Sequence, residues 1–155
     1  QSIASGCTFE DAADQQQKMR AFGTQLVPIS DSRYPSRLRE IFDPPAVLFA
    51  RGRTELLDSV MLGVVGTRRP TTYGVAATER LTSDLAKAQL TIVSGMARGV
   101  ATSAHKATLA AEGNTIAVFG CGVSGLRSAL GPEASSGNVE RCVRVGRGHP
   151  GRCRR

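Results

Sequence analysis

The 155-residue sequence contains no tryptophan, and aromatic residues make up only 5% of it. Long apolar runs are also lacking, so no segment approaches the roughly 20 residues of a membrane-spanning helix. No two cysteines have the CxxC spacing of a zinc or redox site; they lie at Cys7, Cys121, Cys142 and Cys153. We therefore predict a cytoplasmic protein with free thiols, no metal site and no membrane partner.

Charge of one sign is in excess, because 20 Lys and Arg face 13 Asp and Glu and give a net charge of +7. Such a balance suggests a polyanionic partner. The excess is uneven, however. Residues 125–155 hold seven Arg and two Glu, a charge of +5, which leaves only +2 for residues 1–124. Net charge is therefore weak support for nucleic-acid binding, and stronger support must come from individual residues.

Apolar spacing predicts the regular elements. Short apolar runs at 46–50, 61–66, 90–93 and 115–120 predict strands, and helical spacing predicts helices over 8–22, 72–90 and 100–112. Thr8 is a plausible start and Gly23 a plausible end of the first helix. Alternation of strand and helix from 61 to 120 predicts parallel βαβ units. The fold class is α/β: a partial Rossmann-like, three-layer fold with a mostly parallel sheet, preceded by a short helical segment.

Composition divides the chain into three parts. Residues 1–45 are predicted to be a helical and linker segment, and residues 46–123 a partial Rossmann-like domain. Residues 124–155 are rich in Arg and Gly, with no apolar period, and we expect them to be irregular. Out-of-frame translation of a GC-rich gene has this composition, so we expect a frame change or truncation near residue 124.

Glycine-bearing loops follow three of the predicted strands. The first loop, 66–74, carries Gly66, Thr67, Arg68 and Arg69; backbone N–H groups at a helix start and arginine guanidiniums suit an anion. It lacks the Lys of a Walker A motif. A plain turn with two solvated arginines remains the alternative.

The second loop, 94–99, holds Ser94, Gly95, Ala97, Arg98 and Gly99, and the third begins at Gly120 and Gly122. Their glycines allow backbone to approach either a ligand or a neighbouring helix. Carboxyl ends of parallel strands share one edge of a sheet, so the three loops should meet there. His105 has no acidic or nucleophilic neighbour in sequence, so we expect a structural role and predict neither a catalytic residue nor a cofactor.

One set of motifs occurs in order along the chain: Tyr34–Leu38, Asp43–Gly52, Val65–Arg68, Tyr73–Gly74, Ser94–Val100, Ala104–His105, Thr115–Val118 and Gly120–Val123. Together they resemble the DNA-processing protein A family (DprA, also called Smf) over about residues 24–123. The resemblance implies a cytoplasmic, non-enzymatic protein that binds single-stranded DNA, protects incoming DNA in natural transformation and helps load the RecA recombinase. It also implies a homodimer for the full-length family.

The resemblance places the DNA site where the glycine loops meet, with Arg68 as the first choice for a phosphate contact. The candidate DNA-binding residues are Gly66, Thr67, Arg68, Arg69, Tyr73, Gly74, Ser94, Gly95, Ala97, Arg98, Gly99, Gly120 and Gly122.

Two features depart from the family pattern. Ala101 stands where the family usually has Asp, and the motifs of the family's later half do not appear after Val123. Two other interpretations therefore stay open. One is a nucleotide-binding or phosphoribosyl-cleaving Rossmann-like enzyme. The other is a non-functional fragment whose incomplete sheet leaves an open edge.

Overall fold

Strands and helices alternate along the chain as the apolar spacing predicts. The computed structural model describes residues 9–21, 23–119 and 142–147. Their elements are α1 (Phe9–Ala21), β1 (Thr24–Pro28), α2 (Ser36–Arg39), β2 (Val47–Arg51), the 3-10 helix η1 (Thr54–Asp58), β3 (Met61–Gly63), α3 (Thr72–Lys87), β4 (Thr91–Gly95), α4 (Val100–Ala110), β5 (Thr115–Phe119) and β6 (Cys142–Arg147).

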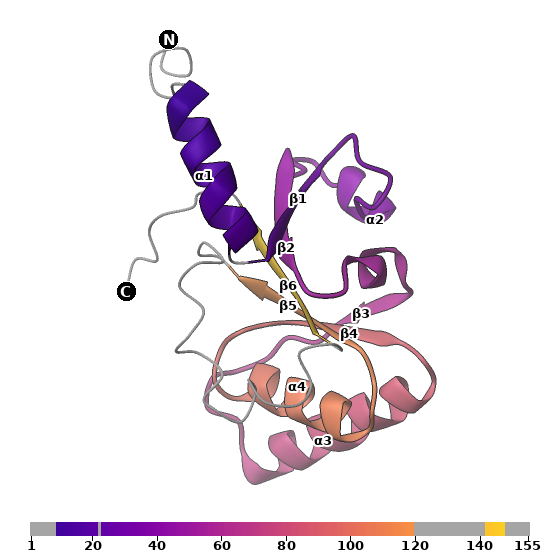
Figure 1. Cartoon of the computed structure of the whole chain (residues 1–155). Helices are drawn as coiled ribbons and strands as arrows, with labels where there is room; N and C mark the ends of the chain where they lie inside the picture. The colour runs from indigo at the N-terminus through magenta and orange to yellow at the C-terminus, as the bar shows by residue number, and fades with distance from the viewer. Residues whose placement is uncertain (1–8, 22, 120–141, 148–155) are drawn as a thin grey trace.

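The strands form one mixed sheet in the order β1-β2-β6-β5-β4-β3 (Figure 1). β3, β4, β5 and β6 pair in parallel, whereas β2 runs antiparallel to β6 and β1 antiparallel to β2. The predicted α/β class and mostly parallel sheet are therefore confirmed. β3 is the end strand, and its outer edge is unpaired within the described residues.

Two strands were not expected. Thr24–Pro28 falls in the segment interpreted as helix and linker, yet it forms β1 and pairs with β2 residue by residue. Cys142–Arg147 falls in the tail expected to be irregular, and that expectation is wrong for these six residues. β6 hydrogen-bonds with β2 on one side and β5 on the other, so partners distant in sequence decide its conformation.

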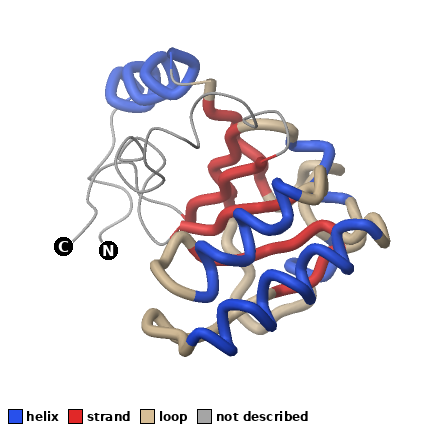
Figure 2. Tube along the Cα trace, turned by 90° about the horizontal axis from the view of Figure 1, so that it is seen from below, coloured by secondary structure: helices blue, strands red, loops and turns tan. Residues whose placement is uncertain are grey.

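Helices α3 and α4 lie together on one face of the sheet (Figures 1 and 2). Successive side chains of a strand point to opposite faces. On β5, Thr115 meets α4, and Ile116 belongs to the core on the other face. That core draws on the sheet, η1 and the segment before β2: Val27, Tyr34, Leu48, Ala50, Leu56, Leu57 and Ile116. The three predicted layers are present, the third being thin.

Small residues let the helical layer sit close to the sheet. The buried face of α4 consists of Ala101, Ala104, His105 and Thr108. Thr108 satisfies its hydroxyl within the helix, donating to the Ala104 carbonyl at 2.8 Å. None of the helices in the described part of the chain is long and apolar enough to cross a membrane.

Helix α3 ends in a turn that usually requires glycine. Gln89 has φ 63°, donates its N–H to Ala86, and is followed by a Leu90 N–H to Leu85 carbonyl bond. The left-handed conformation disfavours any residue with a Cβ. The side chain of Gln89 is exposed, so little packing opposes a substitution.

Gln89→Gly is expected to raise the free energy of unfolding by about 0.5–1 kcal/mol, because relief of backbone strain exceeds the added entropy of the unfolded chain. Urea denaturation followed by circular dichroism measures the change. Ala88→Gly is the control: Ala88 has φ −79°, so glycine there should destabilise. A loss of stability in Gln89→Gly would contradict the prediction.

Candidate functional site

A cavity of about 740 Å³ opens where the first and second loops meet the end of β5. It lies at the carboxyl ends of the parallel strands, the edge predicted from the sequence. Its lining residues are Arg68, Arg69, Met96, Ala97, Arg98, Val118 and Phe119. We call it the arginine cavity.

Three guanidinium groups face this cavity from two loops. Arg68 and Arg69 come from the loop after β3, and Arg98 comes from the loop after β4. All three side chains are exposed, and within the described residues none forms an ion pair with Asp or Glu. Unpaired guanidiniums at one site favour an anion that can accept paired hydrogen bonds, such as phosphate.

An apolar wall, which the glycine and arginine motifs did not predict, completes the cavity. Val118 is 40% exposed, whereas Phe119 is 6% exposed and forms the cavity's inner boundary at the end of β5. Met96 of the second loop is half-buried beside them. The position of Phe119, directly before Gly120, was the available signal. The cavity thus combines cationic groups with an apolar surface.

The glycines of the two loops allow the loops to touch each other. Gly99 has φ 87°, and a Cβ there would lie 2.8 Å from the carbonyl carbon of Arg68. A Cβ on Gly66 would lie 2.7 Å from a methyl group of Val100. The Val100 N–H donates to the Thr67 carbonyl at 3.2 Å, which joins the first loop to the start of α4. These glycines therefore serve loop-to-loop contact.

Other predicted residues shape the loops from inside. Ser94 is buried and donates its hydroxyl to the Val64 carbonyl at 2.6 Å, linking the ends of β3 and β4. The Thr67 hydroxyl accepts the Arg69 N–H at 3.2 Å. Gly74 donates its N–H to the Thr71 hydroxyl at 3.1 Å, which caps α3. These bonds fix the conformation of the two loops.

Of the remaining candidates, two are described and do not line the cavity, and two fall outside the described residues. Tyr73, in the first turn of α3, is 82% exposed and does not line the cavity. Gly95 belongs to the second loop, and its carbonyl is a hydrogen-bond acceptor for His105. Gly120 and Gly122 lie outside the described residues.

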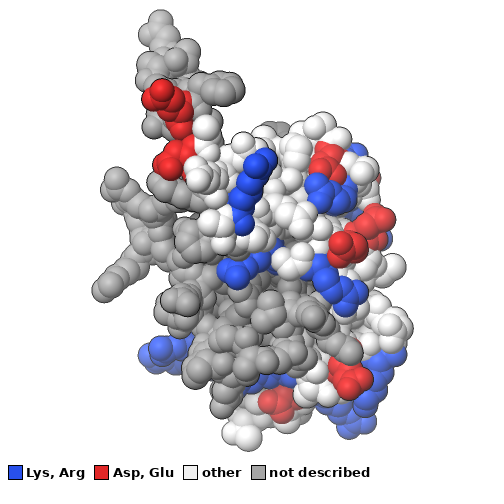
Figure 3. Space-filling model, viewed as in Figure 1, with Lys and Arg blue, Asp and Glu red and all other residues white. Residues whose placement is uncertain are grey.

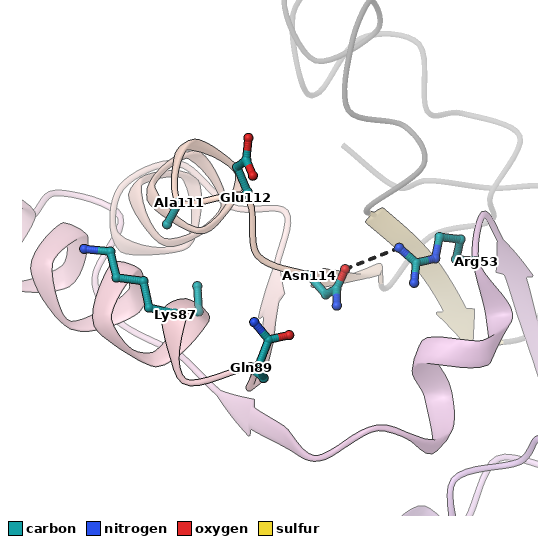
Figure 4. Close-up of a pocket in the computed structure, with 7 residues that line it drawn as sticks. Arg53, Lys87, Gln89, Ala111, Glu112 and Asn114 are labelled. Carbon is teal, nitrogen blue, oxygen red and sulfur yellow. Dashed lines mark hydrogen bonds between the residues drawn. The ribbon is translucent and has the colours of Figure 1, made fainter.

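A second cavity, of about 840 Å³, lies at the opposite ends of the parallel strands (Figure 4). Arg53 donates to the Asn114 side-chain oxygen at 3.5 Å across it, and Glu112 and Lys87 add opposite charges. The carboxyl ends of α3 and α4 also face it, and helix carboxyl ends carry partial negative charge. The arginine cavity is therefore the better anion site.

Charged side chains of both signs are visible on one face of the molecule (Figure 3). On the face shown in Figure 3, Lys and Arg alternate with Asp and Glu among neutral residues, and the described part shows no large field of one sign there. This agrees with the small net charge of residues 1–124.

His105 is buried, 5% exposed, between α4 and the sheet. Nδ1 lies 2.7 Å from the Thr115 hydroxyl oxygen, and Nε2 lies 3.2 Å from the Gly95 carbonyl oxygen. Burial lowers the pKa of His105 from its ordinary value of 6.5, although the nearby Gly95 and Ser94 backbone partly opposes this. The imidazole is thus neutral at pH 7 and out of solvent, which fits the structural role predicted. No cluster of potential metal ligands occurs among the described residues.

The depressed pKa of His105 predicts a pH-dependent stability. In the unfolded chain the His105 imidazole takes up a proton near pH 6.5, whereas in the folded protein it does so only at lower pH. The contribution of the neutral imidazole to the free energy of unfolding is therefore complete above pH 6.5 and is lost as the pH falls below it. We expect the free energy of unfolding to fall between pH 7.5 and pH 5.5, and to fall less in His105→Gln. Urea titrations at both pH values measure this; identical pH dependence in the two proteins would contradict it.

Comparison with known proteins identifies the family of this chain. The family model for DNA recombination-mediator protein A matches residues 25–135 of the chain. The chain belongs to this family. Among curated relatives, it is 43% identical over 104 residues to DNA processing protein DprA of Bacillus subtilis, covering 66% of the chain and 35% of that protein. It is 39% identical over 99 residues to Protein Smf of Escherichia coli, covering 64% and 26%.

Solved structures of DprA proteins resemble the fold. DprA from Streptococcus pneumoniae matches with a TM-score of 0.77 and 31% identity, covering 91% of this chain and 49% of that one. DprA from Helicobacter pylori, described for its single-stranded DNA binding mode, matches with a TM-score of 0.66 and 28% identity, covering 79% and 55%. The chain thus spans about half of these structures and about a third of its curated relatives' length.

Proposed function

We propose that this DprA-family chain binds single-stranded DNA in the arginine cavity and acts as part of a DNA-processing recombination mediator. One observation carries the proposal: Arg68, Arg69 and Arg98, without acidic partners in the described residues, face an apolar wall across one cavity. Arginines neutralise phosphates, and apolar surface accommodates unstacked bases, which a duplex does not expose.

The proposal is one of binding without catalysis. His105 is the buried titratable group nearest the second loop, and its two ring nitrogens are both engaged in hydrogen bonds. The finer role follows the family resemblance: the full-length protein, as a homodimer, would protect incoming DNA and help load RecA during natural transformation. Tyr73, which does not line the cavity, and Gly120 and Gly122, which the described residues do not include, stay part of this proposal.

Fluorescence anisotropy with a labelled oligo-dT tests the proposal. We expect binding that weakens steeply as salt rises from 50 to 200 mM, with a slope of log K against log salt of about −0.7 for each phosphate neutralised. Unlabelled duplex of equal length should compete poorly. Binding of a mononucleotide that barely responds to salt, with no oligo-dT binding, would instead support a nucleotide-binding protein. A chain without a cooperative unfolding transition would support the fragment interpretation.

A further inference from the structure

Helix α4 brings an imidazole to the base of the second loop. The residues around His105 on the buried face are small, with Ala101 7% exposed and Ala104 fully buried. The helix can therefore approach the sheet closely enough for the ring to reach both β4 and β5. Its hydrogen-bond partners are Gly95, the last residue of β4, and Thr115, the first residue of β5.

The hydrogen-bond partners of the ring determine what each ring nitrogen must do. A backbone carbonyl can only accept, so Nε2 carries the proton and donates to Gly95. In the neutral ring Nδ1 is then an acceptor, which requires the Thr115 hydroxyl, 2.7 Å away, to donate to it. The same hydroxyl lies 2.8 Å from the Ile92 carbonyl, its alternative acceptor. The Nε2 bond to Gly95 therefore requires the single Thr115 hydroxyl proton to point at Nδ1, because a Thr115 bond to Ile92 would call for a proton on Nδ1.

The Gly95 carbonyl, which His105 contacts, directly precedes the segment that forms one side of the arginine cavity. Met96, Ala97 and Arg98 follow Gly95 directly and line the cavity. α4 also holds this segment further along, since the Thr102 hydroxyl donates to the Ala97 carbonyl at 2.9 Å. Two side chains of one helix therefore anchor two carbonyls of the loop, on either side of Met96.

We propose that His105 is a positioning residue, which holds the Gly95 carbonyl so that Met96 to Arg98 keep the shape required for single-stranded DNA. It would act through the loop backbone and would not touch the DNA. The inference rests on the proposed function for its effect on binding, but its effect on the loop can be measured without DNA.

Substitution of His105 by Gln or by Asn distinguishes the roles of the two ring nitrogens. The Gln amide nitrogen reaches the place of Nε2, whereas the shorter Asn amide reaches only that of Nδ1. In His105→Asn we expect hydrogen exchange at the Met96 to Arg98 amides about tenfold faster and oligo-dT affinity about fivefold to tenfold weaker, the size of one lost hydrogen bond. His105→Gln should stay within about twofold of the unmodified protein in both. Equal behaviour of the two variants, after correction for global stability, would overturn the proposal.

The unmodified protein provides a test that does not depend on either variant folding. Nitrogen-15 NMR of the histidine ring distinguishes the tautomers, and we expect a protonated Nε2 with a through-bond coupling to the Gly95 carbonyl at pH 7.5. A proton on Nδ1 would overturn the proposal. If oligo-dT does not bind the unmodified protein, the proposed function fails, while loop exchange and tautomer still decide the role of His105 in shaping the loop.

Discussion

Gly99→Ala is expected to lower the free energy of unfolding by about 2–4 kcal/mol, because backbone strain and overpacking coincide at this residue. Gly99 has φ 87° and ψ −131°, a conformation that residues with a Cβ strongly disfavour. The added Cβ would meet the Thr67 carbonyl oxygen and lie 2.8 Å from the Arg68 carbonyl carbon. Because these are backbone atoms, relief requires the two loops to separate, and oligo-dT affinity should fall as well. Urea denaturation and anisotropy measure the two effects.

Alanine substitutions of two other glycines in the same loops serve as comparisons. A Cβ on Gly95 would meet nothing within 4 Å, so Gly95→Ala is the matched control and should leave stability nearly unchanged. Gly66→Ala should be intermediate, because its Cβ would lie 2.7 Å from a Val100 methyl group but Gly66 does not have the positive φ of Gly99. If Gly95→Ala proved as damaging as Gly99→Ala, contact between the loops would not be the cause.

Replacing Arg68, Arg69 and Arg98 together by alanine is expected to weaken oligo-dT binding about 1000-fold or more at low salt, since each charge-assisted contact contributes roughly 1.5–3 kcal/mol. The slope of log K against log salt should become shallower by about 2 if all three contact phosphate. The side chains are exposed and have no acidic partner in the described residues, so global stability should hardly change. Salt titrations of anisotropy provide both quantities.

The single variant Arg68→Ala should also weaken binding, and Arg53→Ala is its matched control. It removes the same charge from an exposed arginine that lines the cavity at the other ends of the parallel strands (Figure 4). Affinity and salt slope should remain close to those of the unmodified chain. An equal loss in Arg53→Ala would mean that binding follows overall charge, and the arginine cavity would lose its special role.

Local pattern was enough to predict the parallel unit. The apolar runs before Gly66, Ser94 and Gly120 correspond to β3, β4 and β5, and the helical spacing between them corresponds to α3 and α4. Burial on both faces leaves a continuous apolar signal in such strands. The two arginine loops followed from the same pattern, because a parallel sheet brings the ends of its strands to one edge.

β1, β6 and the apolar wall could not be predicted, because they depend on contacts between residues distant in sequence. β1 is a five-residue strand, Thr-Gln-Leu-Val-Pro, without an alternation of polar and apolar residues, and its partner β2 lies about 20 residues later. β6 carries the sequence Cys-Val-Arg-Val-Gly-Arg, which composition assigns to a tail, and only its two neighbours in the sheet define it as a strand. Val118 and Phe119 were interpreted as strand core, because a sequence does not reveal where a sheet ends and a cavity begins.

Helix α4 has a consequence for the rate at which DNA binds. Its backbone holds Thr67 of the first loop, and its side chains hold Gly95 and Ala97 of the second. The two loops are therefore fixed to one helix before any ligand arrives, and little conformational entropy remains to be lost on association. Association should be fast and governed by attraction between arginines and phosphates, while variants of the apolar wall should differ in how long the DNA stays bound.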